Sequence, residues 1–225
     1  MVGSRAEGVI RFESVHEPGP LEERRLGETA RVLMAWREIL VRLALLGQDP
    51  ARYAGAGYGN LSARIGPFGD SPRGRRRFLV TGSQTGERRY LTLADFCVVE
   101  EYDPTRNRVR STGPVPPSSE ALTHGALYDI APAARVVIHV HAPEVWRRAR
   151  DLGIPATRPS ALNGTPELAL EVQRLCREGV AASLGILVMG GHPDGVLAFG
   201  ASADEAGGIL LRQLARALAL EARSR

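Results

Sequence analysis

Apolar residues recur at helical spacing along the first long segment of the chain. Between Leu21 and Leu46 these positions are Leu26, Ala30, Leu33, Ile39, Leu40 and Leu43. The spacing predicts a helix over 21–46, and Gly47 stands where a left-handed C-cap is expected. Residues 1–20 include the turn-forming EPGP at 17–20, and they predict a poorly ordered lead-in.

Short apolar runs bounded by turn residues occupy the middle of the chain. The segments 59–65 (GNLSARI), 77–82 (RFLVTG) and 97–103 (CVVEEYD) predict strands. The segment 67–77 between the first two, PFGDSPRGRRR, predicts an exposed hairpin-like loop. Its four arginines, at 73 and 75–77, are not interleaved with aromatic residues, so a solvated loop is favoured over a nucleic-acid contact.

Helices and strands alternate in the second half. Helices are expected at 116–131, 143–152, 166–178 and 201–222, and strands at 136–141, 186–191 and 195–200. The short, hairpin-connected strands favour a largely antiparallel sheet that is covered by helices. The pattern predicts one α/β domain over 21–225, because neither a repeat nor an interdomain linker appears.

The basic residues narrow the chemistry. All 29 are arginines, and the 225-residue chain has no lysine. This excludes mechanisms that need a side-chain amine, such as a Schiff-base aldolase or a Walker-type phosphate site. The net charge of +4 comes from 29 positive and 25 negative residues, a mixed surface that does not favour a nucleic-acid partner.

The remaining composition bears on location. The sequence lacks a signal-like start and an apolar run long enough for a membrane span, so we expect a cytoplasmic protein with no membrane partner. Cys97 and Cys176 lie in separate apolar segments, which predicts buried, reduced thiols. Cys176 is a candidate metal ligand, but its place on a helix face favours a core role.

Three of the five histidines lie in contexts suited to a metal. His139 and His141 alternate with Val136, Ile138 and Val140, so on a strand both imidazoles leave the same face. The alternative is a solvent-facing pair on a half-buried strand. His192 follows two glycines at a strand end, where it either caps a turn or converges with that pair. Three imidazoles would leave a fourth coordination position open, as in a catalytic zinc site.

Several motifs in a fixed order jointly resemble the class II aldolase/adducin family. They are 59–62 (GNLS), Thr81-Gly82, 91–96 (LTLADF), 117–120 (PSSE) with His124 one turn later, His139-Val140-His141, and His192. The resemblance covers about 30–220 and implies a three-layer α/β/α sandwich around a mostly antiparallel sheet, commonly assembled as a homotetramer. Members include sugar-phosphate aldolases, an epimerase, dehydratases and decarboxylases that use a divalent metal, and adducin-like structural proteins.

The resemblance also implies roles for residues. His139, His141 and His192 correspond to the metal ligands, and Glu120 to the catalytic acid/base. The residues that correspond to a substrate phosphate pocket are Asn60, Thr81, Gly82, Ser118 and Ser119. Without lysine, a phosphate would be held by hydroxyls, backbone N–H groups and a helix start, which Pro116 to Ser119 are expected to supply. The alternative for Ser119 and Glu120 is simple helix capping.

The implied activity is that of a metal-dependent lyase or isomerase in carbohydrate metabolism. A divalent ion, Zn²⁺ first and Mn²⁺, Fe²⁺ or Co²⁺ as alternatives, would stabilise the enediolate of a small hydroxycarbonyl or sugar-phosphate-like substrate. Aldolase-type C–C cleavage is favoured, and Glu120 would move the proton. His124, four residues later, would either orient Glu120 or pack in the core.

Departures from the family keep alternatives open. The family aldolases carry a tyrosine, and the epimerases an aspartate, in the region that here reads 157–163 (TRPSALN). Pro193 and Asp194 follow His192 where glycine is usual, and Gly57 stands where a hydroxyl is frequent. A decarboxylase or dehydratase of the same fold is therefore one alternative. A non-catalytic, adducin-like interaction module is the other.

Overall fold

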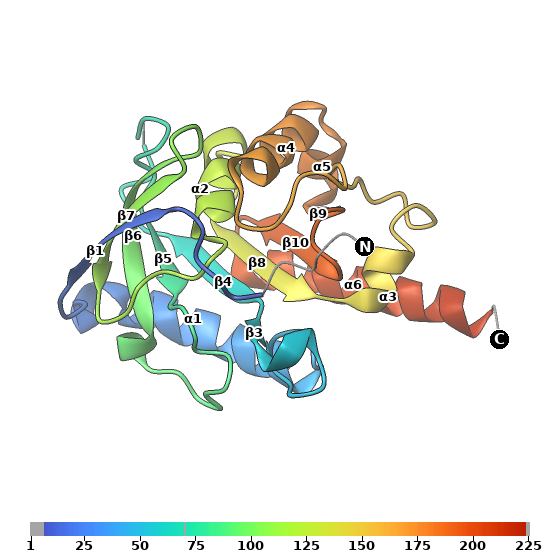
Figure 1. Cartoon of the computed structure of the whole chain (residues 1–225), viewed down its shortest axis with the longest axis horizontal. Coiled ribbons are helices and arrows are strands. Elements are labelled where there is room, and N and C mark those ends of the chain that lie inside the picture. Colours follow the sequence, from blue (N-terminus) through green and yellow to red (C-terminus); the bar gives the residue numbers. More distant parts are fainter. Residues whose placement is uncertain (1–6, 70, 224–225) are drawn as a thin grey trace.

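A computed structural model of the chain describes residues 7–69 and 71–223, which build one eight-stranded sheet and a separate two-stranded ribbon, β2–β3. The sheet order is β1-β7-β6-β5-β4-β8-β10-β9 (Figure 1). The strands are β1 (Glu13–Pro18), β2 (Gly47–Gln48), β3 (Gly57–Tyr58), β4 (Asn60–Arg64), β5 (Phe78–Thr81), β6 (Phe96–Asp103), β7 (Arg108–Gly113), β8 (Val136–His141), β9 (Ile186–Val188) and β10 (Gly195–Gly200). All pairs in the sheet are antiparallel except β1 with β7, so the predicted, mostly antiparallel architecture is confirmed.

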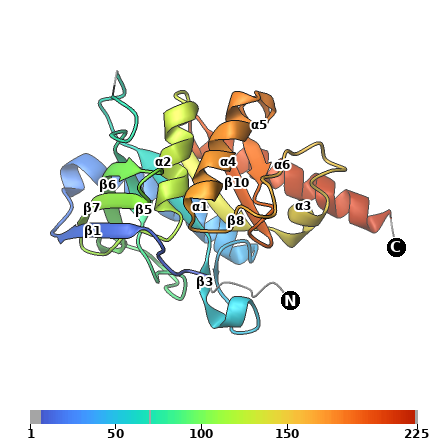
Figure 2. The same ribbon diagram turned by 45° about the horizontal axis from the view of Figure 1, so that its top comes forward.

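Helices cover both faces of the sheet (Figures 1 and 2). The helices are α1 (Glu23–Arg42), α2 (Ala121–Ile130), α3 (Pro143–Arg147), α4 (Pro166–Arg177), α5 (Val180–Leu184) and α6 (Ala203–Ala222), with short 3₁₀ turns at Tyr53–Gly55 and Leu93–Asp95. Helices α1, α3 and α6 pack in one apolar cluster, and α2, α4 and α5 in the other. The result is the three-layer α/β/α sandwich that the resemblance implied.

Strand β8 separates the two cores by simple alternation. Val136, Ile138 and Val140 point into the α1/α6 core, whereas Val137 points into the α2/α4 core. Because side chains alternate along a strand, His139 and His141 leave on the same side as Val137. The predicted shared face of the two histidines is therefore confirmed.

The helix ends show where local sequence decides structure. Thr165 accepts a hydrogen bond from Leu168 N to start α4, and Ser202 accepts one from Glu205 N to start α6. The expected cap at Gly47 is wrong: α1 ends at Arg42, Ala44 takes the left-handed conformation at φ 55°, and Gly47 belongs to β2.

The N-terminal segment corrects the expectation of a poorly ordered lead-in over 1–20. Residues 1–6 lie outside the described part, but β1 is a regular strand beside β7, and Phe12 before it is buried. Both faces of β1 are largely exposed, so its sequence carries no apolar alternation. Backbone pairing with β7 defines this strand, which is why its side chains did not predict it.

The arginine-rich loop forms ion pairs with acidic residues of β6 and α2. Arg75 pairs with Glu101, Arg76 with Asp129 and Arg77 with Glu100. Three of the four arginines therefore have acidic partners, and the loop is largely exposed, as expected. Cys97 and Cys176 are buried free thiols, as expected. None of the helices in the described residues has the length and apolar content to cross a bilayer.

Candidate metal centre

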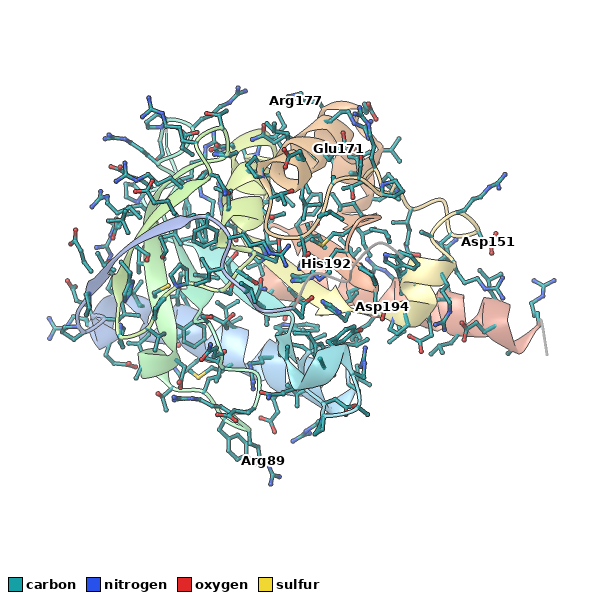
Figure 3. All side chains as sticks on the ribbon, viewed as in Figure 1. Arg89, Asp151, Glu171, Arg177, His192 and Asp194 are labelled. Carbon is teal, nitrogen blue, oxygen red and sulfur yellow. The ribbon has the colours of Figure 1, made fainter. Side chains whose placement is uncertain are left out.

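Three buried imidazoles converge at the end of β8. His139 and His141 have no exposed surface, His192 is 2% exposed, and one ligand atom from each lies within 4.8 Å of the others. The ring centroids are 5.3, 5.1 and 4.8 Å apart. In Figure 3, His192 lies in the interior, whereas charged residues such as Arg89 and Asp151 project from the rim. The sequence-predicted convergence is therefore present.

His192 reaches the cluster from the tight turn that joins β9 to β10. The strand expected at 186–191 ends at Val188, so His192 lies beyond its end. Gly195 N donates to His192 O at 2.9 Å, and Met189 N donates to Gly195 O at 2.9 Å. A Cβ on Gly191 would lie 2.1 Å from Ala161 O, so glycine is needed for this approach. Asp194, part of the departure from the family pattern, has φ 64° and accepts a hydrogen bond from Tyr53 Oη at 2.7 Å.

The cluster holds buried nitrogens without hydrogen-bond partners among the described residues. These are His139 Nε2, both ring nitrogens of His141, and His192 Nδ1. Buried polar atoms are normally satisfied, so several unpaired imidazole nitrogens at one point indicate a missing partner. Imidazole nitrogens are preferred ligands of Zn²⁺ and related ions, and three of them fit a divalent metal.

Asn60 orients one member of the cluster. The Nδ2 atom of its side-chain amide lies 3.2 Å from His139 Nδ1. Its Oδ1 atom has no hydrogen-bond partner in the described structure. A half-turn of the amide presents Oδ1 to a protonated Nδ1. That tautomer leaves the lone pair of His139 Nε2 directed toward the other imidazoles, as metal binding requires.

The electrostatics favour the neutral form of two of the imidazoles. Burial lowers the pKa of His139 and His141, and the neighbouring imidazoles add to the effect. Burial also opposes charge on His192, but the hydrogen bond and negative charge of Glu7, with a contribution from Glu120, raise its pKa. Because metal ligands must be deprotonated, the lowered pKa values of His139 and His141 favour metal binding, whereas the raised pKa of His192 opposes it.

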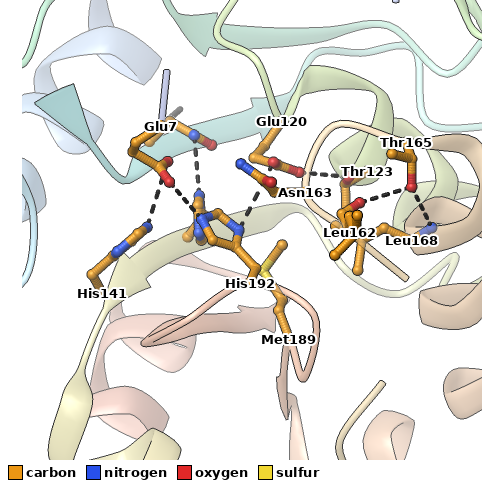
Figure 4. Close-up of polar contacts among 12 residues, drawn as sticks. Glu7, Glu120, Thr123, His141, Leu162, Asn163, Thr165, Leu168, Met189 and His192 are labelled. Atoms are coloured by element: carbon orange, nitrogen blue, oxygen red, sulfur yellow. Dashed lines mark hydrogen bonds and ion pairs between the residues drawn. The ribbon is translucent and has the colours of Figure 1, made fainter. Parts of the chain in front are cut away.

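A second acidic residue enters the cluster that the sequence did not predict. Glu7 Oε2 lies 2.8 Å from His192 Nε2, and its Oε1 lies 3.6 Å from His141 Nε2 (Figure 4). Burial opposes ionisation of Glu7, but its contacts with the two histidines outweigh this and lower its pKa. Glu7 lies 185 residues from His192 in a segment without strong patterning, so nothing local pointed to it.

Glu120 lies on the opposite edge of His192. Its Oε1 atom is 4.0 Å from His192 Nδ1 and has no hydrogen-bond partner in the described residues, whereas Oε2 accepts a hydrogen bond from Thr123 Oγ1 at 2.7 Å. Glu120 is 1% exposed, and this burial raises its pKa. A partly unpaired carboxyl with a raised pKa beside the cluster is suited to proton transfer.

The helix start differs from its prediction. Helix α2 begins at Ala121, so Glu120 is the N-cap residue, and its side chain does not cap the helix. His124 does not orient Glu120: its Nδ1 is bonded to Ser62 Oγ at 2.7 Å inside the core. Thr123, which sequence reasoning passed over, takes that orienting position.

A polar cavity of about 360 Å³ opens beside the cluster. Four predicted binding residues, Asn60, Gly82, Ser118 and Ser119, line it together with Glu7. The bridge between Gly82 and Pro117 brings the two segments together, and Ser118 Oγ is unpaired in the described structure. Thr81 differs from this group, because its hydroxyl accepts a hydrogen bond from Leu61 N within the sheet.

Residues in the departing segment 157–163 have structural partners. Thr157 Oγ1 accepts a hydrogen bond from Gly190 N at 2.9 Å, and Arg158 N donates to Glu171 at 3.1 Å. Asn163 accepts hydrogen bonds from Arg11. The segment therefore braces the His192 turn and the N-terminal segment.

Comparison with known proteins identifies a matching family and several solved structures with a similar fold. The family described as Class II Aldolase and Adducin N-terminal domain matches residues 49–212. A search of curated protein sequences finds no match. Solved structures with this fold include an L-fuculose-1-phosphate aldolase from Thermus thermophilus, which is 22% identical with a TM-score of 0.59. That alignment covers 86% of this chain and 93% of the aldolase.

Two other similar structures have different descriptions. A sugar-phosphate aldolase from Thermotoga maritima is 16% identical with a TM-score of 0.62, over 89% of this chain and 97% of that protein. YgbL from Klebsiella pneumoniae, provisionally described as an aldolase/epimerase/decarboxylase, is 18% identical with a TM-score of 0.59, over 90% and 91% of the two chains. At these identities, the likeness establishes a shared fold.

Proposed function

The chain belongs to the class II aldolase and adducin family, and on that premise we propose that it is a divalent-metal-dependent lyase or isomerase of small hydroxycarbonyl compounds. Aldol-type C–C cleavage is the favoured reaction. The observation that carries the proposal is the buried cluster of three histidines, with unpaired nitrogens, beside a polar cavity.

His139, His141 and His192 would hold the ion. A bound divalent cation would supply a Lewis acid that stabilises negative charge on a carbonyl oxygen, the role that an amine has in lysine-dependent aldolases. Zn²⁺ is the first candidate, because three imidazole ligands are common in its catalytic sites. A non-catalytic interaction module has no need for unpaired, buried imidazoles, so the cluster favours an enzyme.

Glu120 would move the proton during the reaction. Its Oε1 atom is unpaired among the described residues, and Thr123 holds its other oxygen, so the carboxyl is oriented with one free acceptor. The raised pKa brings its protonation equilibrium closer to neutral pH, where one group can both accept and return a proton.

The cavity would select a small polar substrate. Asn60, Ser118 and Ser119 offer neutral donors, and Gly82 places backbone close to the cavity. Such donors suit a phosphate or several hydroxyl groups, and the cavity volume of about 360 Å³ is suited to a small metabolite. The segment 157–163 lacks both tyrosine and aspartate, which favours a decarboxylase or dehydratase as the second candidate.

The proposal is tested by metal analysis followed by a product screen. We expect the protein to bind one divalent ion per chain and, when loaded, to release a carbonyl product from sugar phosphates or related hydroxycarbonyls. Carbon dioxide release from hydroxy- or keto-acids would instead identify the second candidate. A purified protein that contains no divalent ion and takes up none on addition would refute the proposal.

Substitution of Glu120 separates chemistry from metal binding. Glu120→Gln should reduce kcat by about 10²–10⁴-fold, the range typical of a lost general acid/base, while the metal content stays unchanged. Glu178→Gln is the matched control, because Glu178 is an exposed residue that pairs with Arg174 on the surface. Equal kcat values for both variants would remove Glu120 from the mechanism.

A further inference from the structure

We infer that Glu7 is a fourth ligand of the metal, supplied by the N-terminal segment. This inference rests on the proposed metal site and adds to it a residue from outside the family match, which begins at residue 49. It starts from the side chains themselves, since a buried carboxylate points into a group of three imidazoles (Figure 4).

The distances from Glu7 to the two imidazoles bracket the separation expected of ligands that share one ion. Two ligands that each lie about 2.0–2.1 Å from a tetrahedral zinc ion are roughly 3.3–3.4 Å apart. The two Glu7 oxygens lie 2.8 Å from His192 Nε2 and 3.6 Å from His141 Nε2, on either side of that value. A small adjustment of the carboxylate would therefore place an oxygen and both nitrogens around one ion.

The two carboxylates near His192 occupy different places. Glu7 contacts Nε2, whereas Glu120 faces Nδ1 at 4.0 Å on the other edge of the ring. His139 shows the same division, because Asn60 contacts its Nδ1 and its Nε2 has no partner among the described residues. The Nε2 atoms thus define the ligating side, and Glu7 is the carboxylate on that side.

A simple ion pair with His192 explains only part of this arrangement. It satisfies one oxygen of Glu7 and leaves His139 Nε2 and His141 Nε2 without hydrogen bonds among the described residues. A divalent cation at the centre would be a common partner for these nitrogens and would compensate the buried negative charge. The complete set of donors is better explained by an ion than by the pair.

The segment that carries Glu7 is anchored a few residues after it, at Arg11 and Phe12. Arg11 donates to Asn163, Asn107 donates to Arg11 O, and Phe12 is buried before β1 begins. Gly8 and Val9, next to Glu7, line the cavity. The same segment therefore forms one wall of the cavity and presents the ligand, so a substrate that binds the ion would compete with Glu7 for a coordination position.

The test compares metal affinity in variants of two glutamates from the same segment. Zn²⁺ affinity is measured by competition with a chromophoric chelator for wild type, Glu7→Gln and Glu13→Gln. Glu13 is the matched control, because it lies on exposed β1 and pairs with Arg108. We expect Glu7→Gln to weaken Zn²⁺ binding at least tenfold and Glu13→Gln to change it less than twofold.

The Co²⁺-loaded proteins give a second readout that is independent of activity. Loss of a carboxylate ligand should change the visible absorption bands of Co²⁺ in Glu7→Gln and leave those of Glu13→Gln as in wild type. If Glu7→Gln has the affinity and spectrum of wild type, or binds Zn²⁺ more tightly, Glu7 is not a ligand. The proposal of a three-histidine site would be unaffected by that result. Absence of metal binding in wild type would overturn both proposals.

Discussion

Buried histidines occupy two places on the same side of the central sheet, and their surroundings differ. One place holds His124 alone, and the other holds the cluster of His139, His141 and His192. His124 is bonded to Ser62 Oγ, which lies 2.8 Å from Tyr128 Oη, between β4 and α2. His139 lies one strand away, with two further imidazoles and a carboxylate within reach. All these rings are buried, and burial lowers the pKa of both His124 and His139.

Burial and a shifted pKa do not by themselves identify a metal site. Both groups have them, and His124 even has one ring nitrogen without a partner in the described residues. Only at His139, His141 and His192, among the residues described, do several donors point to one position. Convergence of donors is the property that separates a metal centre from a polar contact in the core.

Removal of one converging histidine should have the largest effect. His139→Ala should weaken Zn²⁺ binding by more than the roughly 10–100-fold that is typical for loss of an outer-shell partner. Equilibrium competition with a chelator measures this change, and His16→Ala is the control, because His16 lies on β1, away from the cluster, and its ring is hydrogen-bonded to Ser111. Equal Zn²⁺ affinities of His139→Ala and His16→Ala would show that His139 is not a metal ligand.

Truncation of the core histidine should alter stability and leave the metal site intact. His124→Ala removes a fully buried ring and its hydrogen bond to Ser62, so we expect a loss of about 2–4 kcal/mol in the free energy of unfolding. Urea unfolding of the metal-free protein measures it. Zn²⁺ affinity should stay within twofold of wild type, and a large fall in affinity would assign His124 to the metal centre.

A smaller effect is expected in the pH dependence of the free energy of unfolding, to which His124 contributes. Burial lowers the pKa of His124 to about 3, from an ordinary value of 6.5, so between these values the unfolded chain binds a proton that the folded protein does not. Stability therefore falls as pH falls through this window, by about 1.4 kcal/mol per pH unit for this residue.

His124→Gln isolates that contribution. Unfolding of the metal-free protein between pH 7 and pH 5 should show a shallower dependence in the variant than in wild type. The histidines of the metal centre are present in both proteins, so their contribution cancels in the difference. Parallel curves would show that His124 is not held neutral by burial.

Local patterns in the sequence predicted the elements whose side chains alternate or cap. The run at 136–141 indicated a strand with both histidines on one face, and the helices expected at 166–178 and 201–222 are present as α4 and α6. These features depend on neighbours only a few residues away. The family motifs then identified four residues of the cavity wall, Asn60, Gly82, Ser118 and Ser119, because the order of the motifs along the chain is specific.

Features that depend on distant backbone were missed. The ladder between β1 and β7 joins a largely exposed strand to one whose buried positions include Ser111 and Gly113, so neither sequence shows apolar alternation that would predict its partner. Glu7 acquires its place only when this ladder holds the N-terminal segment across the site. Thr81 appeared to be a ligand-binding hydroxyl, but its hydrogen bond with Leu61 N depends on the pairing of two strands.

The parallel pairing of β1 with β7 has a consequence for the order of folding. His16 on β1 and Ser111 on β7 are 95 residues apart, and Glu7 meets His192 across 185 residues, whereas His139 and His141 share one strand. Contacts between distant residues form slowly, because a long loop must close before they contribute. His192 is nearer in the chain to this strand than Glu7 is to His192, so we expect the three imidazoles to assemble before the N-terminal segment docks, which leaves the nascent site open to metal.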